Sequence, residues 1–240
     1  MHIRHVTISV PDPAETARFL TSLFGFPLDH AHRGESLRLG TSRLSLVEGS
    51  MEPNGFYHLA FEIPENTVYA ARDLLAARIP ILDAGDNGIV AGSPAWDSHS
   101  VYFNAPGNLN LELIGRHRLP NAITSPFSLS DILRISEVGV PVENPLVAAQ
   151  ELQDQTGFIP FGEPSEMFAP VGTDDGLLIL VKHGRIWFPT ADQTTTRRPL
   201  RVENDGIDGT VVVESGDHGA RPTSSLSVRK SADAGRGNVS

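Results

Sequence analysis

Phe56-Tyr57-His58-Leu59-Ala60-Phe61-Glu62-Ile63 is the stretch of sequence that decides the fold. Its side chains alternate between two faces, which is the pattern of a half-buried β-strand. One face carries Tyr57, Leu59, Phe61 and Ile63, which can pack on helices. The other face carries His58 beside the small Ala60, where a metal ion or a substrate has room. A lone histidine on a strand is more often structural than a ligand. Whether His58 is a ligand therefore depends on comparable strands elsewhere in the chain.

Composition narrows the class of protein. The chain has 240 residues, 40% of them apolar, which is ordinary for a globular protein with one large or two small domains. Its net charge of −10 argues against nucleic acid as the main partner, because phosphate binding needs a basic face. There is no cysteine, which excludes disulfides, zinc–thiolate sites and cysteine nucleophiles. A metal must therefore be held by histidine, carboxylate or water.

The N-terminal residues show no signal-peptide pattern, and no apolar run is long enough to cross a bilayer. We therefore expect a cytoplasmic enzyme or binding protein without a membrane partner.

The order of predicted elements is β-α-β-β-β, and it repeats. The first unit has a strand over residues 3–10, a helix over 14–24, and strands over 27–30, 36–39 and 43–47. The second unit has the strand over 56–63, a helix over 64–78, and strands over 79–82, 87–91, 99–103 and 109–114.

A third unit repeats the sequence pattern of the first at a constant offset. Each residue of Ser136–Pro145 lies 132 positions after its counterpart in Arg4–Pro13, and the spacing holds as far as Gly157-Phe158. Self-similarity of this kind is typical of duplicated modules. A strand over 177–182 closes the third unit. Strands over 198–203 and 210–214 are interpreted as a degenerate fourth unit.

Three ionisable residues lie on equivalent faces of these repeated strands: His5, His58 and Glu112. Two imidazoles and one carboxylate form a facial set that leaves coordination positions open. The set suits Fe(II) or Mn(II), and Zn(II) would use the same three ligands. A substrate with two adjacent oxygens can chelate at the open positions. The alternative is that both histidines are satisfied core residues and Glu112 faces solvent at the rim.

Several segments resemble the vicinal oxygen chelate superfamily, which includes glyoxalase I, fosfomycin-resistance enzymes and extradiol dioxygenases. They are His5–Val10 with Phe19–Gly25, then Tyr57–Phe61, and then Val101–Asn108 leading to Glu112. The resemblance implies an α+β fold of paired βαβββ modules, each pair curling into a cupped mixed sheet around one metal. We therefore predict paired modules one and two with the metal site over 1–115, a linker over 116–131, modules three and four over 132–214, and a disordered tail over 215–240.

The reaction is not determined by the fold, because one scaffold hosts many chemistries. Glyoxalase I usually has a fourth ligand, a glutamate, at the position that Ser45 occupies here. The set of two histidines and a glutamate instead matches the dioxygenase and fosfomycin patterns. The spacing of Tyr102 to the Pro106-Gly107 turn and to Glu112 is that of the dioxygenases, so Tyr102 is predicted to hydrogen-bond a chelated oxygen.

An extradiol-type dioxygenase is the preferred prediction, with His99 as a candidate general acid/base. Two departures count against it: the metal falls in the first pair of modules rather than the second, and the spacing of His99 to Tyr102 differs from the family pattern. The alternatives are a non-redox glyoxalase-like lyase or isomerase, a thiol transferase, and a resistance protein that sequesters a small molecule. In each case the partner is a small molecule, with vicinal oxygens in the enzymatic cases.

The third module carries only Glu137, at the position that aligns with His5. We interpret this half as structural, shaping substrate access or offering a surface for a homodimer. Trp187 and Phe188 are predicted to be core residues.

Overall fold

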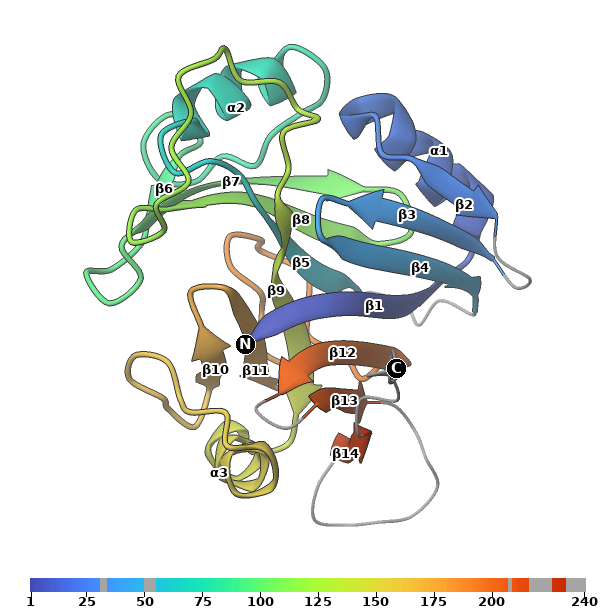
Figure 1. Cartoon of the computed structure of the whole chain (residues 1–240), viewed down its shortest axis with the longest axis vertical. Helices are drawn as coiled ribbons and strands as arrows, with labels where there is room; N and C mark the ends of the chain where they lie inside the picture. Colours follow the sequence, from blue (N-terminus) through green and yellow to red (C-terminus); the bar gives the residue numbers. More distant parts are fainter. Residues whose placement is uncertain (31–33, 50–54, 207–208, 216–225, 232–240) are drawn as a thin grey trace, which may run out of the picture.

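The computed structural model describes residues 1–30, 34–49, 55–206, 209–215 and 226–231, whose strands form two seven-stranded sheets (Figure 1). In spatial order, the first sheet contains β14 (Leu226–Ser231), β13 (Gly209–Ser215), β12 (Leu200–Gly206), β1 (His2–Val10), β4 (Ser42–Glu48), β3 (Glu35–Leu39) and β2 (Leu28–His30). The second contains β10 (Phe168–Thr173), β11 (Gly176–Lys182), β9 (Arg134–Val142), β5 (Tyr57–Glu62), β8 (Leu109–Arg116), β7 (Ser98–Ala105) and β6 (Val90–Ala91).

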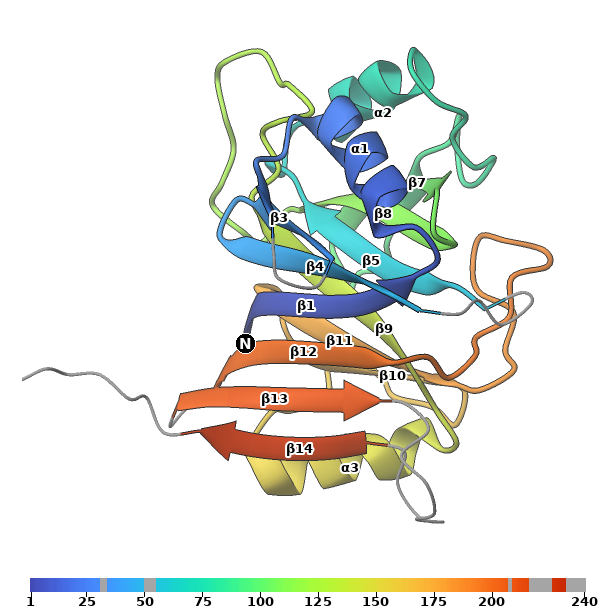
Figure 2. The ribbon, with the colours of Figure 1, turned by 90° about the vertical axis from the view of Figure 1, so that its right-hand side faces the viewer.

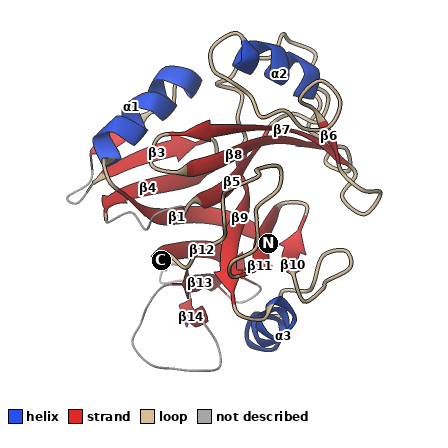
Figure 3. Cartoon of the chain, turned by 180° about the vertical axis from the view of Figure 1, so that it is seen from behind, coloured by secondary structure: helices blue, strands red, loops and turns tan. Residues whose placement is uncertain are grey.

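The repeat predicted from the sequence is visible in two helices with matching ends. In α1 (Pro13–Phe24) the Asp12 side chain accepts a hydrogen bond from the Glu15 backbone, and Gly25 ends the helix at φ 71°. In α3 (Pro145–Thr156) Asn144 caps the start and Gly157 ends the helix at φ 77°. Asx caps before proline and left-handed glycines after the last turn are strong helix boundaries. Figure 3 shows α1 at one end of the molecule and α3 at the other.

The second unit departs from its predicted elements at the helix and the strand after it. The helix α2 spans only Val68–Ala76, shorter than predicted. The strand expected over 79–82 is reduced to one bridge, between Ile81 and Phe103. Pro80 lies inside this segment and has no N–H to donate, which limits ladder pairing there.

The pairing of units differs from the prediction. β1 pairs antiparallel with β12, and β5 pairs antiparallel with β9, so units one and two lie in different sheets (Figure 2). Unit two shares its sheet with unit three, and unit one shares its sheet with the strands of the fourth. The prediction that residues 1–115 form one pair around the metal is therefore wrong. Periodicity within a unit fixes its own strands, but it carries no information on which unit completes the sheet.

The two sheets share one hydrophobic core, which includes buried residues from every unit. Phe24 of α1 lies with its ring centroid 6.0 Å from that of Phe61 on β5 and 6.0 Å from that of Phe103 on β7. These contacts join the first unit to the second, even though the two contribute to different sheets.

The C-terminal region contains a strand where a disordered tail was predicted. Leu226–Ser231 pairs antiparallel with β13 as strand β14. The rest of the predicted tail, residues 216–225 and 232–240, lies outside the described residues. Among the described residues, no helix is long and apolar enough to span a membrane.

Candidate metal site

Strand β5 alternates as its sequence predicts. Tyr57, Leu59 and Phe61 are buried in the core, and His58 points to the opposite face. Ala60 lies two residues after His58, on the same face of the strand. Its neighbours in the sheet are Glu112 on the parallel strand β8 and Glu137 on the antiparallel strand β9. Because alanine has only a methyl group, it leaves space between the two carboxylates.

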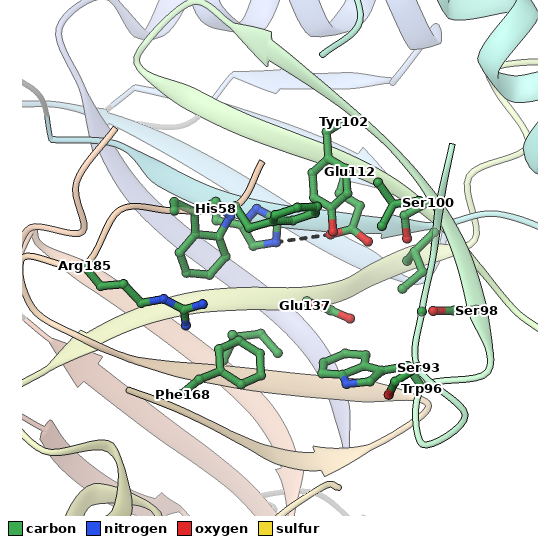
Figure 4. Close-up of a pocket in the computed structure, with 16 residues that line it drawn as sticks. His58, Ser93, Trp96, Ser98, Ser100, Tyr102, Glu112, Glu137, Phe168 and Arg185 are labelled. Atoms are coloured by element: carbon green, nitrogen blue, oxygen red, sulfur yellow. Dashed lines mark ion pairs between the residues drawn. The ribbon is translucent and has the colours of Figure 1, made fainter. Parts of the chain in front are cut away.

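The side chains of His58, Glu112 and Glu137 converge at one point on this face (Figure 4). One ligand atom from each lies within 4.8 Å of the others, and all three residues are buried. The His58 Nε2 atom is 3.4 Å from a Glu112 carboxylate oxygen. A spacing of this kind is compatible with three ligands around one divalent ion.

The hydrogen bonds around His58 indicate which of its nitrogens carries a proton. Its Nδ1 atom is 3.1 Å from the Asn110 side-chain oxygen. That oxygen is identified by the other end of the amide, whose NH₂ group donates to Asn104. Nδ1 is therefore the donor, and in the neutral ring Nε2 presents a lone pair. In metal sites of proteins, a ligating histidine typically donates a hydrogen bond from its other ring nitrogen, which fixes its tautomer and the orientation of the ring.

Three acceptors consequently face one another in a buried place: the imidazole lone pair and two carboxylates. Buried acceptors need a proton or a cation between them. This arrangement fits a divalent metal held by His58, Glu112 and Glu137.

Glu137 is also bound from behind by Arg116. The Arg116 side chain is fully buried, pairs with Glu137 Oε1, and donates to the Ser136 hydroxyl at 3.3 Å. Burial and the nearby Glu112 carboxylate raise the pKa of Glu137 to about 7, and Arg116 lowers it in part. The guanidinium compensates some of the negative charge that two buried carboxylates would otherwise accumulate.

Tyr102 lies opposite Glu112 in the β7–β8 ladder. Burial raises the pKa of its hydroxyl well above the usual value, and the facing Glu112 carboxylate raises it further. Tyr102 therefore keeps its proton at neutral pH and acts as a hydrogen-bond donor. Its role as a donor to a chelated oxygen stays a prediction.

The triad lies in the wall of a cavity of about 390 Å³. Most of the remaining lining is apolar or hydroxylic, and comes from units two and three: Val90, Gly92, Ser93, Trp96, Ser98, Ser100, Tyr102, Ile114, Phe168, Ile179, Arg185, Trp187 and Phe188. The third unit is thus part of the site, and not only a structural cover. Trp187 is buried, as predicted for a core residue, whereas Phe188 is 52% exposed.

The structure does not bring His5 to this triad. His5 lies on β1 in the other sheet, with Nε2 2.8 Å from the Ser45 hydroxyl and Nδ1 3.6 Å from Glu203. Ser45 and Glu112 occupy matching places, since Ser45 pairs with Thr7 as Glu112 pairs with Ala60. The first sheet therefore has serine where the second has a ligand carboxylate. His5 thus has one hydroxyl and one carboxylate near its ring, whereas His58 has two carboxylates.

His99 is likewise not among the residues that line the cavity. It lies on the face of β7 opposite Tyr102, as strand alternation requires, and its ring is 6.5 Å from that of Tyr69 on α2. Its Nδ1 atom is 2.7 Å from His117, which in turn contacts Glu65 at 2.9 Å. A general acid/base acting on a ligand in the cavity would have to come from another residue.

Sequence reasoning missed Glu137 as a member of the triad, although the repeat contained the signal. Glu137 aligns with His5 at the same position of a buried strand. The first strand of each unit thus carries an ionisable residue there. The sequence did not reveal that the strand completing the site comes from unit three and not from unit one.

Comparisons with known proteins support the fold. No protein-family model and no curated protein matches the sequence. Among solved structures, a Bacillus subtilis protein described as a "putative dioxygenase" is 12% identical with a TM-score of 0.57, covering 90% of this chain and 82% of that one. A V278E mutant of glyoxalase I from Zea mays is 14% identical with a TM-score of 0.53, covering 91% and 89%. The chain therefore has the α+β fold of the vicinal oxygen chelate superfamily, as predicted.

Proposed function

We propose that this chain is a metal-dependent enzyme that binds its substrate through two adjacent oxygens. The observation that carries the proposal is the convergence of three buried acceptors, one imidazole and two carboxylates, beside a cavity. His58, Glu112 and Glu137 would hold the ion and leave positions open for substrate and water. A divalent metal at this place supplies Lewis-acid polarisation of the chelating oxygens.

The residues around the triad have separate tasks in this proposal. Asn110 orients the His58 ring through its Nδ1 atom. Tyr102 donates a hydrogen bond to a substrate oxygen, because it stays protonated. Trp187, whose ring lies 4.5 Å from that of His58, helps to exclude water from the ion.

The ligand set favours non-redox chemistry of the lyase or isomerase kind. Oxygen-activating iron sites are typically built from two histidines and one carboxylate, whereas carboxylate-rich sites suit Mn(II) and other hard cations. Here the second histidine of the predicted set is replaced by Glu137. Mn(II) is therefore our first choice of metal, with Fe(II) and then Zn(II) as alternatives.

Extradiol-type ring cleavage is the second candidate. The position of Tyr102 beside Glu112, in a cavity with several aromatic side chains, favours it. Oxygen uptake with a panel of catechols on the Fe(II)-loaded protein separates the two. Uptake coupled to ring opening would support the dioxygenase, and its absence would leave the non-redox reaction.

The metal site itself is tested by metal analysis of protein purified without chelator and by calorimetric titration with Mn(II). We expect one ion per chain in the wild type and little or none in Glu112→Gln. Glu203→Gln is the matched control, because Glu203 neighbours a histidine in the other sheet. If the wild type binds no ion, or if both variants bind equally, the proposed function is wrong.

A further inference from the structure

The cavity is larger than one ion and two chelating oxygens require. Its volume of about 390 Å³ lies in the range of sites that enclose a whole small molecule. The additional space must accommodate the body of the ligand, so the walls remote from the triad indicate what that body is.

Five aromatic residues line the cavity, and four of them form two contacting pairs. Trp96 and Phe168 are neighbours with ring centroids 6.2 Å apart, and in Figure 4 they lie across Glu137 from His58 and Tyr102. On the other side, Phe188 packs edge-on against Tyr102 at 5.8 Å. The two aromatic pairs offer faces and edges on which a flat ring placed in the cavity can pack.

Arg185 adds a positive charge to this lining. It belongs to the loop after β11, and its guanidinium lies 5.3 Å from the centre of the Phe168 ring (Figure 4). Its Nη1 atom donates to the Met167 carbonyl at 3.4 Å, a long bond that uses one of five N–H groups. None of the ion pairs found within the described residues includes Arg185. The buried arginine nearby, Arg116, is already paired with Glu137.

The remaining charges of the cavity lining are the carboxylates Glu112 and Glu137, which would hold the ion. An anionic group on the ligand would be repelled by them where no cation intervenes, but it would find a guanidinium fork at Arg185. A carboxylate matches that fork with two parallel hydrogen bonds.

We propose that the cavity takes an aromatic ligand with an anionic group, such as a carboxylate, at the end away from its chelating oxygens, and that Arg185 pairs with this group. The placement of the chelating oxygens rests on the proposed function. The pairing with Arg185 does not. Arg185 would thus determine specificity for acidic aromatic substrates.

The test compares matched acidic and neutral probes, 3,4-dihydroxybenzoate and 3,4-dihydroxybenzamide, on the Mn(II)-loaded full chain under nitrogen. Both tryptophans of the chain, Trp96 and Trp187, line the cavity, so quenching of their fluorescence reports binding. We expect the acid to bind at least about tenfold more tightly than the amide in the wild type. In Arg185→Gln the two should differ by less than about twofold, with the amide unchanged.

Arg197→Gln is the matched control, since Arg197 pairs with Glu143 and is not part of the cavity lining. It should keep the wild-type preference. Equal binding of both probes by the wild type, or an equal loss for both in Arg185→Gln, would overturn the inference.

A second pair of probes separates this inference from the proposed function. 4-Methylbenzoate and 4-methylbenzamide lack vicinal oxygens, so their difference in affinity measures Arg185 alone. We expect the preference for the acid to persist in metal-free protein and to disappear in Arg185→Gln. If no metal binds but this preference remains, the proposed function fails and the anionic subsite stands. If metal binds and the preference is absent, the anionic subsite fails and the proposed function stands.

Discussion

At the scale of single residues, a difference between equivalent positions of the repeated units changes the chemistry expected of the site. The first strand of unit three carries Glu137 where the first strands of units one and two carry His5 and His58. A carboxylate in that place adds a charge to a buried site, and the structure compensates it with a buried arginine. Two predictions follow from this pair.

The first concerns the pH dependence of metal binding. The pKa of Glu137 is raised to about 7 by burial and by Glu112. A carboxyl must lose its proton before it binds a cation, so protons compete with the metal below that pKa. The apparent affinity for Mn(II) should therefore rise about tenfold from pH 6 to pH 8. Calorimetric titrations at pH 6, 7 and 8 measure it.

Glu137→Gln is the control for this titration, because its amide has no proton to release. Its affinity should be weaker and should depend much less on pH. A variant whose affinity rises as steeply as that of the wild type would show that another group governs the titration.

The second prediction concerns Arg116, whose removal leaves a buried carboxylate without its counter-ion. Arg116→Met should lower the free energy of unfolding of the metal-free protein by about 3–5 kcal/mol at pH 8, measured by urea denaturation. The loss should be smaller at pH 6, because Glu137 is then largely protonated. Replacing both partners, in Arg116→Met with Glu137→Met, should recover most of the stability.

Arg197→Met is the comparison for this series. Arg197 pairs with Glu143 at the surface, where an ion pair contributes about 0–1 kcal/mol. Similar losses for Arg116→Met and Arg197→Met would mean that the buried pair is not important for stability.

At the scale of elements, the sequence predicted the ends of α1 and of its repeat α3 well, because those ends depend on local chemistry, but it placed α2 over 64–78 instead of Val68–Ala76. Pro13 and Pro145 begin equivalent helices after Asp12 and Asn144, and glycine ends both. Local rules also placed most strands. They failed over residues 79–82, where a single bridge replaces the expected strand.

The repeat allows a matched prediction for these caps. The Asn144 side chain accepts hydrogen bonds from the backbones of Leu146 and Val147 at 3.1 and 3.2 Å. Asn144→Ala should lower the free energy of unfolding by about 1 kcal/mol, and Asp12→Ala by a similar amount. Urea denaturation measures both. Neither should change the metal content, since neither cap touches the triad. A loss of metal in either variant would contradict this separation of stability from the site.

At the scale of the whole molecule, the sequence could not predict which units share a sheet. Each first strand has the same alternation and the same position for an ionisable residue, so β1 and β9 are equivalent candidates to lie beside β5. Contacts between distant segments determine which of the two strands pairs with β5, and that strand is β9. For this reason two of the three predicted ligands, His58 and Glu112, lie together, while His5 lies with Ser45 in the other sheet.

The effect of metal on global stability tests this assignment directly. A ligand that binds only the folded state at a hundred times its dissociation constant stabilises it by about 2.7 kcal/mol. For a chain of this size that corresponds to a rise of about 5–10 °C in Tm. Saturating Mn(II) should therefore raise the calorimetric Tm of the chelator-treated wild type by this amount. His5→Ala should show the same rise, because His5 is outside the triad, and His58→Ala should show almost none. The opposite result, a rise lost in His5→Ala and kept in His58→Ala, would mean that the ion binds in the first sheet and that the triad of the second sheet is filled by protons.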